Sequence, residues 1–117
     1  MEKPKKYDLE ERTGRFGEEI IKFCQNIQKN EITKPLINQL IKCSTSVGAN
    51  FCEADDAESK ADFKHKIGIC KKESRESKHF LKMFMVATPE KQKTLEGLLN
   101  EARELNLIFN SIYNKLK

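Results

Sequence analysis

The chain has 117 residues, enough for one hydrophobic core, and its 34% charged residues and mean hydropathy of −0.68 make it polar. No run approaches the roughly 18 consecutive apolar residues that a membrane-spanning helix needs. Residues 1–6 are charged, but no apolar stretch follows them, so they do not resemble a secretory signal. We therefore expect a cytoplasmic protein. With only 5 Gly and 3 Pro, the composition also argues against an all-β fold with many tight turns.

Apolar residues recur at alternating steps of three and four along four segments, which is the period of an amphipathic helix. These segments cover residues 9–27, 36–54, 63–84 and 95–116. The connections between them are short, and short connections make consecutive helices antiparallel neighbours. The sequence therefore predicts an all-α fold, an antiparallel up-down-up-down four-helix bundle.

The residues before each segment are typical of helix starts, because Ser, Thr and Asp side chains can accept from the first free backbone N–H groups. The expected caps or first residues are Asp8, Thr33, Ser59 and Thr88. We expect residues 8–117 to form a single bundle domain. Residues 1–7, which are rich in Lys, are expected to be a basic N-terminal tail.

No two of the four cysteines are spaced as Cys-x-x-Cys, so the sequence gives little support to a zinc site. In a cytoplasmic protein, reductants keep cysteines as thiols. Free cysteine commonly behaves as a small buried apolar side chain. We therefore expect four buried free thiols, at Cys24, Cys43, Cys52 and Cys70.

A second line of apolar and small residues runs along the second segment, beside its main apolar line. Gly48 belongs to it and costs about 1 kcal/mol relative to Ala inside a helix, so a compensating close contact is expected. The third segment likewise holds Ile69, Phe80 and Met83 away from its main line. Surplus apolar surface usually marks an interface, whereas the alternative is a wide core-facing stripe. The predicted oligomer interface consists of Ile37, Ile41, Ser44, Gly48 and Phe51.

The net charge of +4 is unevenly distributed along the chain. Residues 58–87 hold eight Lys or Arg against four acids, whereas residues 31–57 hold two against four. In the third segment, basic residues recur at helical spacing on one flank of the apolar line, with Gly68 in the gap. Such a stripe can contact several phosphates. The alternative is a solvated helix face, partly neutralised by Glu73 and Glu76. The predicted nucleic-acid-binding residues are Lys60, Lys64, Lys71, Arg75, Lys78 and Lys82.

One pattern resembles a metal site. Glu76 and His79 form a Glu-x-x-His pair, as in di-iron four-helix proteins, and Asp62 and His65 share that spacing. A dinuclear site needs such pairs on separate helices, whereas both pairs here lie in one segment, on the face away from its apolar line. No Gly-rich phosphate loop is present, and the only Ser or Cys near a His is Ser77. We expect no catalytic residue, no metal and no cofactor, and therefore no enzyme.

Two motifs resemble a known family. Residues 46–54, Ser-Val-Gly-Ala-Asn-Phe-Cys-Glu-Ala, resemble the Ser-Ile-x-x-Asn-x-x-Glu-Gly/Ala signature of small bacterial four helix bundle proteins, some of them encoded by intervening sequences in 23S ribosomal RNA genes. Residues 72–81 are similar to that family's Lys-Glu-Ala-x-Glu-Thr-x-Tyr-Trp-Leu segment, with His79 and Phe80 in place of Tyr-Trp. The resemblance implies an antiparallel four-helix bundle that assembles as a homopentamer and, for some members, an association with the ribosome.

The basic stripe and this resemblance together predict a non-enzymatic homo-oligomer that binds RNA or a ribonucleoprotein. The alternative is a protein-interaction scaffold without a nucleic-acid ligand, in which the stripe only solvates a helix. Salt dependence separates the two, because phosphate binding weakens steeply with salt whereas an apolar contact responds little. The expected partners are a second copy of the chain and RNA, and no membrane.

Overall fold

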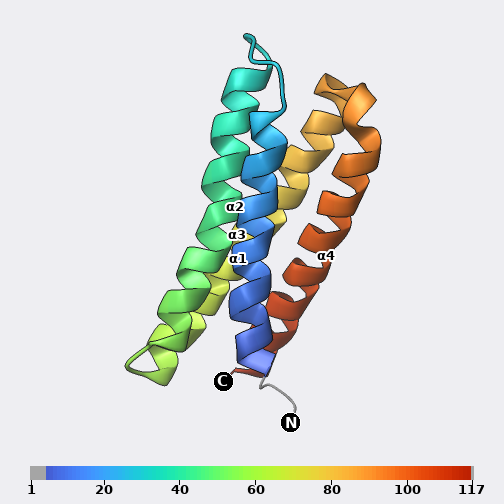
Figure 1. The fold of residues 1–117 in the computed structure, drawn as a ribbon. Helices are drawn as coiled ribbons and strands as arrows, with labels where there is room; N and C mark the ends of the chain where they lie inside the picture. The colour runs from blue at the N-terminus through green and yellow to red at the C-terminus, as the bar shows by residue number, and fades with distance from the viewer. Residues whose placement is uncertain (1–4, 117) are drawn as a thin grey trace.

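The structure, a computed structural model, describes residues 5–116, with side chains described from Leu9 onward. It contains four long helices and one 3-10 turn: α1 Lys5–Gln25, α2 Thr33–Asp55, α3 Lys60–Ala87, the 3-10 turn Pro89–Lys91 and α4 Gln92–Lys115. The helices form an antiparallel bundle (Figure 1), which confirms the predicted all-α, up-down-up-down fold. Within the described residues, every helix is too short or too polar to cross a membrane.

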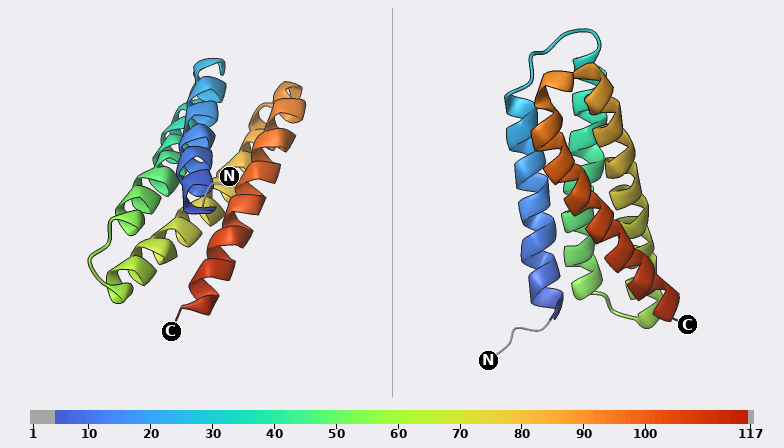
Figure 2. Two further views of the ribbon diagram at one scale, coloured as in Figure 1. Left: turned by 60° about the horizontal axis from the view of Figure 1, so that its bottom comes forward. Right: turned by 90° about the vertical axis from the view of Figure 1, so that its right-hand side faces the viewer.

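Helices that follow one another in the chain also pack side by side. α2 lies between α1 and α3, whereas α4 packs along α3 and meets α1 over a smaller contact (Figure 2). Ion pairs stabilise the contact between α1 and α4. The guanidinium of Arg12 in α1 donates to both carboxylate oxygens of Glu101, at 2.7 and 2.8 Å, and to Glu104 at 2.6 Å. The two acids raise the pKa of Arg12, chiefly through the hydrogen bond to Glu101, so this clamp stays charged.

Two of the helix starts are capped by side chains. Ser59 caps α3 as predicted, because its hydroxyl accepts from the backbone N–H of Asp62 at 3.0 Å. At α2 the same task falls to Asn30 rather than to Thr33. The Asn30 side-chain oxygen accepts from the N–H groups of Ile32 at 2.9 Å and Thr33 at 2.8 Å.

The start of α1 differs from the prediction. The helix begins at Lys5, so the expected cap at Asp8 is wrong. Lys and Tyr are both tolerated inside helices, and nothing in residues 5–7 ends the helix before Asp8. The helix thus includes part of the segment expected as a tail at residues 1–7. The other part, residues 1–4, lies outside the described residues.

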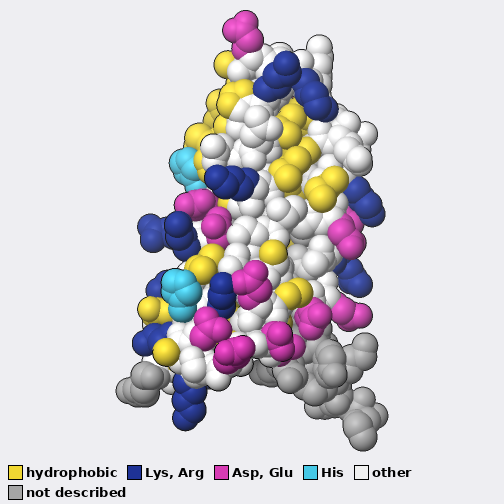
Figure 3. Space-filling model, turned by 90° about the vertical axis from the view of Figure 1, so that its left-hand side faces the viewer, with side chains coloured by type: hydrophobic (Ala, Val, Ile, Leu, Met, Phe, Trp, Pro, Cys, Tyr) yellow, Lys and Arg dark blue, Asp and Glu magenta, His cyan; other side chains and the backbone are white. Residues whose placement is uncertain are grey.

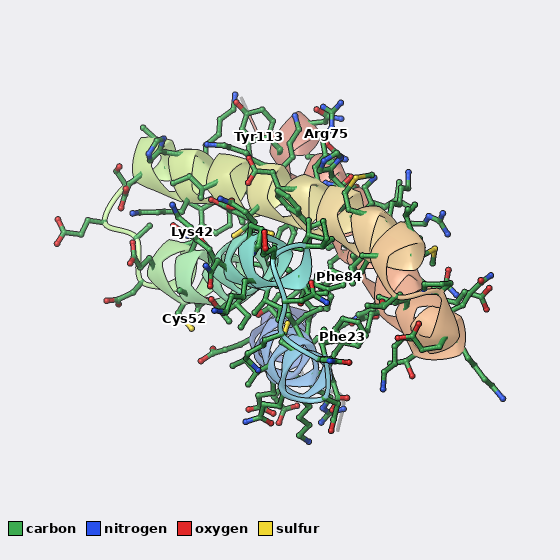
Figure 4. All side chains as sticks on the ribbon, turned by 90° about the horizontal axis from the view of Figure 1, so that it is seen from above. Phe23, Lys42, Cys52, Arg75, Phe84 and Tyr113 are labelled. Carbon is green, nitrogen blue, oxygen red and sulfur yellow. The ribbon has the colours of Figure 1, made fainter. Side chains whose placement is uncertain are left out.

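Aromatic side chains link non-adjacent helices in the core. Phe23 of α1 meets Phe84 of α3 edge to face, with ring centroids 5.3 Å apart (Figure 4). Phe51 of α2 lies 6.0 Å from Phe109 of α4, centroid to centroid. All four rings are buried. The core therefore runs through the middle of the bundle and leaves the outer flanks of α3 and α4 free for polar side chains.

The second apolar line of α2 belongs to this core, so its prediction as an oligomer interface is wrong. Ile41 is half-buried and packs against the core. Gly48 faces α1, where an added Cβ would lie 3.3 Å from the backbone oxygen of Thr13. Because α2 packs against neighbours on more than one side, it needs an apolar stripe that is wider than a single line. The other members are buried: Ile37, Ser44, Gly48 and Phe51.

α3 does expose apolar side chains outside the core. Met83 is 39% exposed and Val86 is 80% exposed, and they lie beside Phe80, which is half-buried and packs against the edge of the core. These three, at steps of three residues, form what we call the outer apolar patch. On the side of the molecule seen in Figure 3, apolar side chains gather in the upper half and acidic ones at the lower end. Of the three residues predicted to lie away from the core line of α3, Met83 is exposed and Ile69 is half-buried, whereas Phe80 packs against the core.

The four cysteines are free, and three of them, Cys24, Cys43 and Cys70, are buried. Burial raises the pKa of Cys24 to about 11 and that of Cys70 to about 12. Burial also raises the pKa of Cys43, against hydrogen bonds with Ser77 and Ser44. Cys52 is exposed on α2 (Figure 4), so the expectation that it is buried is wrong.

Candidate nucleic-acid interface

The six predicted basic residues share one flank of α3. Steps of three, four and seven residues return to nearly the same angle around a helix, and these steps separate the six side chains. The half-buried members are Lys64, Lys71 and Lys78, whereas Lys60, Arg75 and Lys82 are exposed. This flank faces the carboxyl-terminal half of α4. The stripe is therefore one wall of a space between two helices.

Two adjoining depressions lie along that border, with volumes of about 550 and 750 Å³. They share Gly68, Lys72 and Tyr113, so we treat them as one feature, the α3–α4 groove. Lys82, alone of the predicted residues, does not line it. Among the residues that the structure describes, neither Asp nor Glu lines the groove. The lining residues are Lys60, Ala61, Lys64, His65, Gly68, Ile69, Lys71, Lys72, Arg75, Lys78, Asn106, Asn110 and Tyr113.

An aromatic ring lies in the middle of the groove. The ammonium groups of Lys64 and Lys71 lie 5.0 and 4.5 Å from the centroid of the Tyr113 ring. The ring also rests against α3, where an added Cβ at Gly68 would lie 3.2 Å from its Cε1 atom. The gap that Gly68 leaves in the basic stripe is thus filled from α4. Figure 4 shows Tyr113 next to Arg75, on the edge of the molecule opposite α1.

Two asparagines of α4 join the helices at the floor of the groove. The amide of Asn106 donates to the backbone oxygen of Lys71 at 2.9 Å and to the hydroxyl of Ser74 at 3.0 Å. The amide of Asn110 donates in turn to the side-chain oxygen of Asn106 at 3.3 Å. Asn106 is only 5% exposed, so these bonds form away from water. They fix α4 against the stretch of α3 that carries the basic side chains.

The charges along the groove are of one sign. The pKa of Lys78 is lowered, first by burial and then by the neighbouring charges of Lys82, Arg75 and Arg103. Arg103 comes from α4, so cations converge from both helices. Like charges that are brought together without acids between them favour the binding of an anion. The groove is therefore suited to a polyanion.

The acids on α3 do not neutralise the stripe. Glu73 and Glu76 are both absent from the lining of the groove. The pKa of Glu73 is raised, chiefly by burial and by Glu76, and the cations that act on it are Lys72 and Lys42 of α2. Glu73 therefore lies toward α2 rather than α4. This placement weighs against a helix face that is merely solvated and charge-balanced.

The Glu-x-x-His pattern assembles no metal site in the described part of the chain. His65 and His79 are both exposed, and the ring of His79 packs edge to face on Phe80, with centroids 5.0 Å apart. Within residues 5–116, no three His, Cys, Asp or Glu side chains come close enough together to hold a metal ion.

Sequence reasoning missed the contribution of α4 to the groove. Helical periodicity identifies side chains on one helix, but Tyr113 and Arg103 meet the stripe only after α3 and α4 pack. One signal was available. Gly68 interrupts the basic stripe inside a helix, and a glycine there favours the close approach of another group. Lys72 lines both depressions as well and is not among the predicted residues.

Comparisons with known proteins agree with the fold and with the motifs. The sequence model of the 23S rRNA-intervening sequence protein family matches residues 5–111. A crystal structure from Bacteroides thetaiotaomicron, described as a protein of unknown function from the S23 ribosomal protein family, superposes with a TM-score of 0.85 at 27% identity, covering 96% of this chain and 100% of that one. Neither description names a reaction. No curated protein matches the chain. The chain belongs to the 23S rRNA-intervening sequence protein family.

Proposed function

We propose that this protein is a non-enzymatic, cytoplasmic, homo-oligomeric RNA-binding protein that holds RNA, alone or in a ribonucleoprotein, in the α3–α4 groove. The observation that carries the proposal is the lining of the groove, which among the described residues holds Lys71, Arg75 and Lys78 but no acid. The charge of Arg103 in α4 acts on Lys78 as well. The family description and the S23 description of the related structure both refer to the ribosome or its RNA, which supports RNA as the polyanion.

The chemistry of the groove fits phosphate better than a carboxylate ligand. A phosphodiester backbone carries one negative charge per nucleotide, so it can pair with each cation along the helix flank. A ligand with a single carboxylate would pair with only one of them. Lysine and arginine side chains contact phosphates without reading the base sequence. Binding through them alone is therefore expected to depend strongly on salt and weakly on sequence.

The test is a charge reversal confined to the groove. The triple variant Lys71→Glu, Arg75→Glu, Lys78→Glu should lose affinity for single-stranded RNA, because each lost phosphate contact contributes about 0.7 to the log–log salt slope. We expect the slope to flatten by about 2. The measurement is fluorescence anisotropy between about 50 and 200 mM salt, the range over which such contacts weaken most visibly.

A matched control separates the groove from overall charge. Lys29→Glu, Lys34→Glu, Lys93→Glu changes the net charge by the same amount at exposed positions that do not line the groove. This control should keep most of the affinity and slope, and circular dichroism should show equal helicity for both variants. If the unmodified protein fails to bind RNA at about 50 mM salt, where phosphate contacts are strongest, the proposal is wrong.

One observation favours the alternative of a protein-binding scaffold. The outer apolar patch exposes Met83 and Val86 beside the half-buried Phe80. We assign this patch to a second copy of the same chain, in line with the homopentamer that the family resemblance implies. Self-association would repeat the basic groove around one assembly and so raise its attraction for a polyanion.

A further inference from the structure

We infer that the α3–α4 groove is a single-strand site, in which an unpaired nucleobase stacks on the ring of Tyr113 while the neighbouring phosphates contact Lys64, Lys71 and Arg75. This inference rests on the proposed function and names its ligand as single-stranded rather than duplex RNA.

The position of Tyr113 is the first reason. The ring is half-buried, lines both depressions and so lies at the centre of the groove rather than at its end. Its edge rests on α3 at Gly68, where an added Cβ would lie 3.2 Å from the ring and so would crowd it. Aromatic rings beside a basic track are the usual platform for bases of a single strand, because every base has a flat face.

The two lysines over the ring are the second reason. In the free protein, Lys64 and Lys71 place their ammonium groups 5.0 and 4.5 Å from the ring centroid. A cation over an exposed ring is held less strongly than a base stacked on it. A base can therefore displace an ammonium group from the ring. The displaced ammonium is then free to contact a phosphate, so the exchange replaces one cation–ring contact with a stacked base and a charged contact.

The shape of the duplex excludes it from this arrangement. In an A-form helix the bases are stacked inside, and side chains cannot read its deep and narrow major groove. Only a strand with unpaired bases can bring a base face onto Tyr113 while its phosphates follow the α3 flank. Phosphate contacts alone would accept both forms. A preference for single-stranded RNA over duplex RNA would therefore indicate that a base stacks on the Tyr113 ring.

The experiment compares three probes of equal length on the full chain: a ten-nucleotide oligoadenylate, an abasic ribose-phosphate ten-mer and a ten-base-pair RNA duplex. Stacking of one base predicts that the unmodified protein binds oligoadenylate roughly 5- to 150-fold more tightly than the abasic strand. The duplex should bind more weakly than oligoadenylate. Fluorescence anisotropy at about 50 mM salt measures all three affinities.

Variants of Tyr113 assign the preference to the ring. In Tyr113→Leu the ratio between the base-bearing and abasic strands should fall to within about twofold, whereas Tyr113→Phe should keep it because the aromatic face remains. The ratio is the readout, since Tyr113 also positions two lysines and its loss can alter both affinities. Leu107→Ala, at an exposed α4 position outside the groove lining, should leave the ratio unchanged.

The outcomes are distinct. Equal affinity of the unmodified protein for oligoadenylate and the abasic strand overturns the inference and leaves phosphate binding in place. A ratio that survives in Tyr113→Leu also overturns it. If the unmodified protein binds none of the three probes, the proposed function itself fails and the inference fails with it. The comparison of probes on unmodified protein needs no variant, so the inference stays testable even if Tyr113→Leu does not fold.

Discussion

Thiol reactivity at single residues follows from burial. A thiolate rather than a thiol is the nucleophile toward alkylating reagents, so a raised pKa and burial both slow the reaction. Burial raises the pKa of Cys24 to about 11 and that of Cys70 to about 12. Burial also raises the pKa of Cys43. Cys52 is exposed to solvent on α2.

We expect one fast-reacting thiol per native chain at pH 8. Iodoacetamide should label Cys52 first, and rapid labelling of the other three cysteines should need denaturant. Mass spectrometry of the digested protein measures the labelling of each cysteine. Because burial raises the pKa of Cys24 to about 11 and that of Cys70 to about 12, these two thiols stay protonated well above pH 9, and their labelling in the native protein should accelerate only toward pH 11. Cys52→Ser should abolish the fast phase. A second fast thiol in that variant would contradict the assignment of burial.

At the same scale, the sequence could predict only part of the groove. Five of the six basic residues of α3 that line it were predicted, because they recur on one flank of one helix and the 3.6-residue period is enough to group them. Tyr113 follows Gly68 by 45 residues and belongs to another helix. Its contact depends on the rotation of α4 and on the angle at which α4 crosses α3, and periodicity fixes neither.

Among the elements, α2 shows why an apolar pattern can be assigned to the wrong partner. Periodicity gives the width of an apolar stripe but not the helix that covers it. The line that contains Gly48 predicts a second subunit, yet other helices of the same chain cover it: α1 at Gly48, α3 at Ser44 and α4 at Phe51. Gly17 of α1 packs against Thr45 of α2 in the same contact, so both helices contribute a glycine to it. Two helices approach closely where such small residues face one another.

The close contact of α1 and α2 makes Gly48→Leu a destabilising change. A Cβ at position 48 already lies 3.3 Å from the Thr13 oxygen, and the further atoms of Leu must push α1 away. Overpacking of this kind lowers the free energy of unfolding by roughly 1–3 kcal/mol. Urea unfolding followed by circular dichroism measures the loss.

Gly97→Ala is the matched control for that substitution. Position 97 lies inside α4, and apart from the adjacent residues and backbone of that helix, no atom of the described residues lies within 4 Å of an added Cβ. Helix propensity is therefore the main property that changes. We expect a gain of up to about 1 kcal/mol in the free energy of unfolding. Equal stability of Gly48→Leu and the unmodified chain would show that α1 and α2 are not packed at this point.

For the whole molecule, the fold was predictable because its simplest topology is also the observed one. Four periodic segments joined by short connections fold most simply as an up-down-up-down bundle. In the first segment, the apolar residues that recur at helical spacing between Leu9 and Ile27 are buried, as expected. The surface is harder to predict. Its function depends on which side chains of different helices come together, as Arg103 and Tyr113 do with the stripe on α3.

Assembly is the prediction that concerns the whole molecule. Val86 is 80% exposed and Met83 is 39% exposed, although both are apolar and lie on the outer side of a long, rigid helix. Burial of such side chains against a second copy is favourable by about 25 cal/mol for each Å² of apolar surface removed from water. We therefore expect native mass spectrometry at micromolar concentration to give a mass near five chains, as the family resemblance implies.

Met83→Glu with Val86→Glu should shift that mass toward one chain, because an interface built on the outer apolar patch would have to bury two carboxylates per copy without partners. Helicity should stay unchanged, since both positions point away from the core. Ile32→Glu, at a 63% exposed position outside the helices, is the control and should leave the mass unaltered. A monomer from the unmodified chain would contradict self-association. An oligomer that persists in the double variant would place the interface on another face.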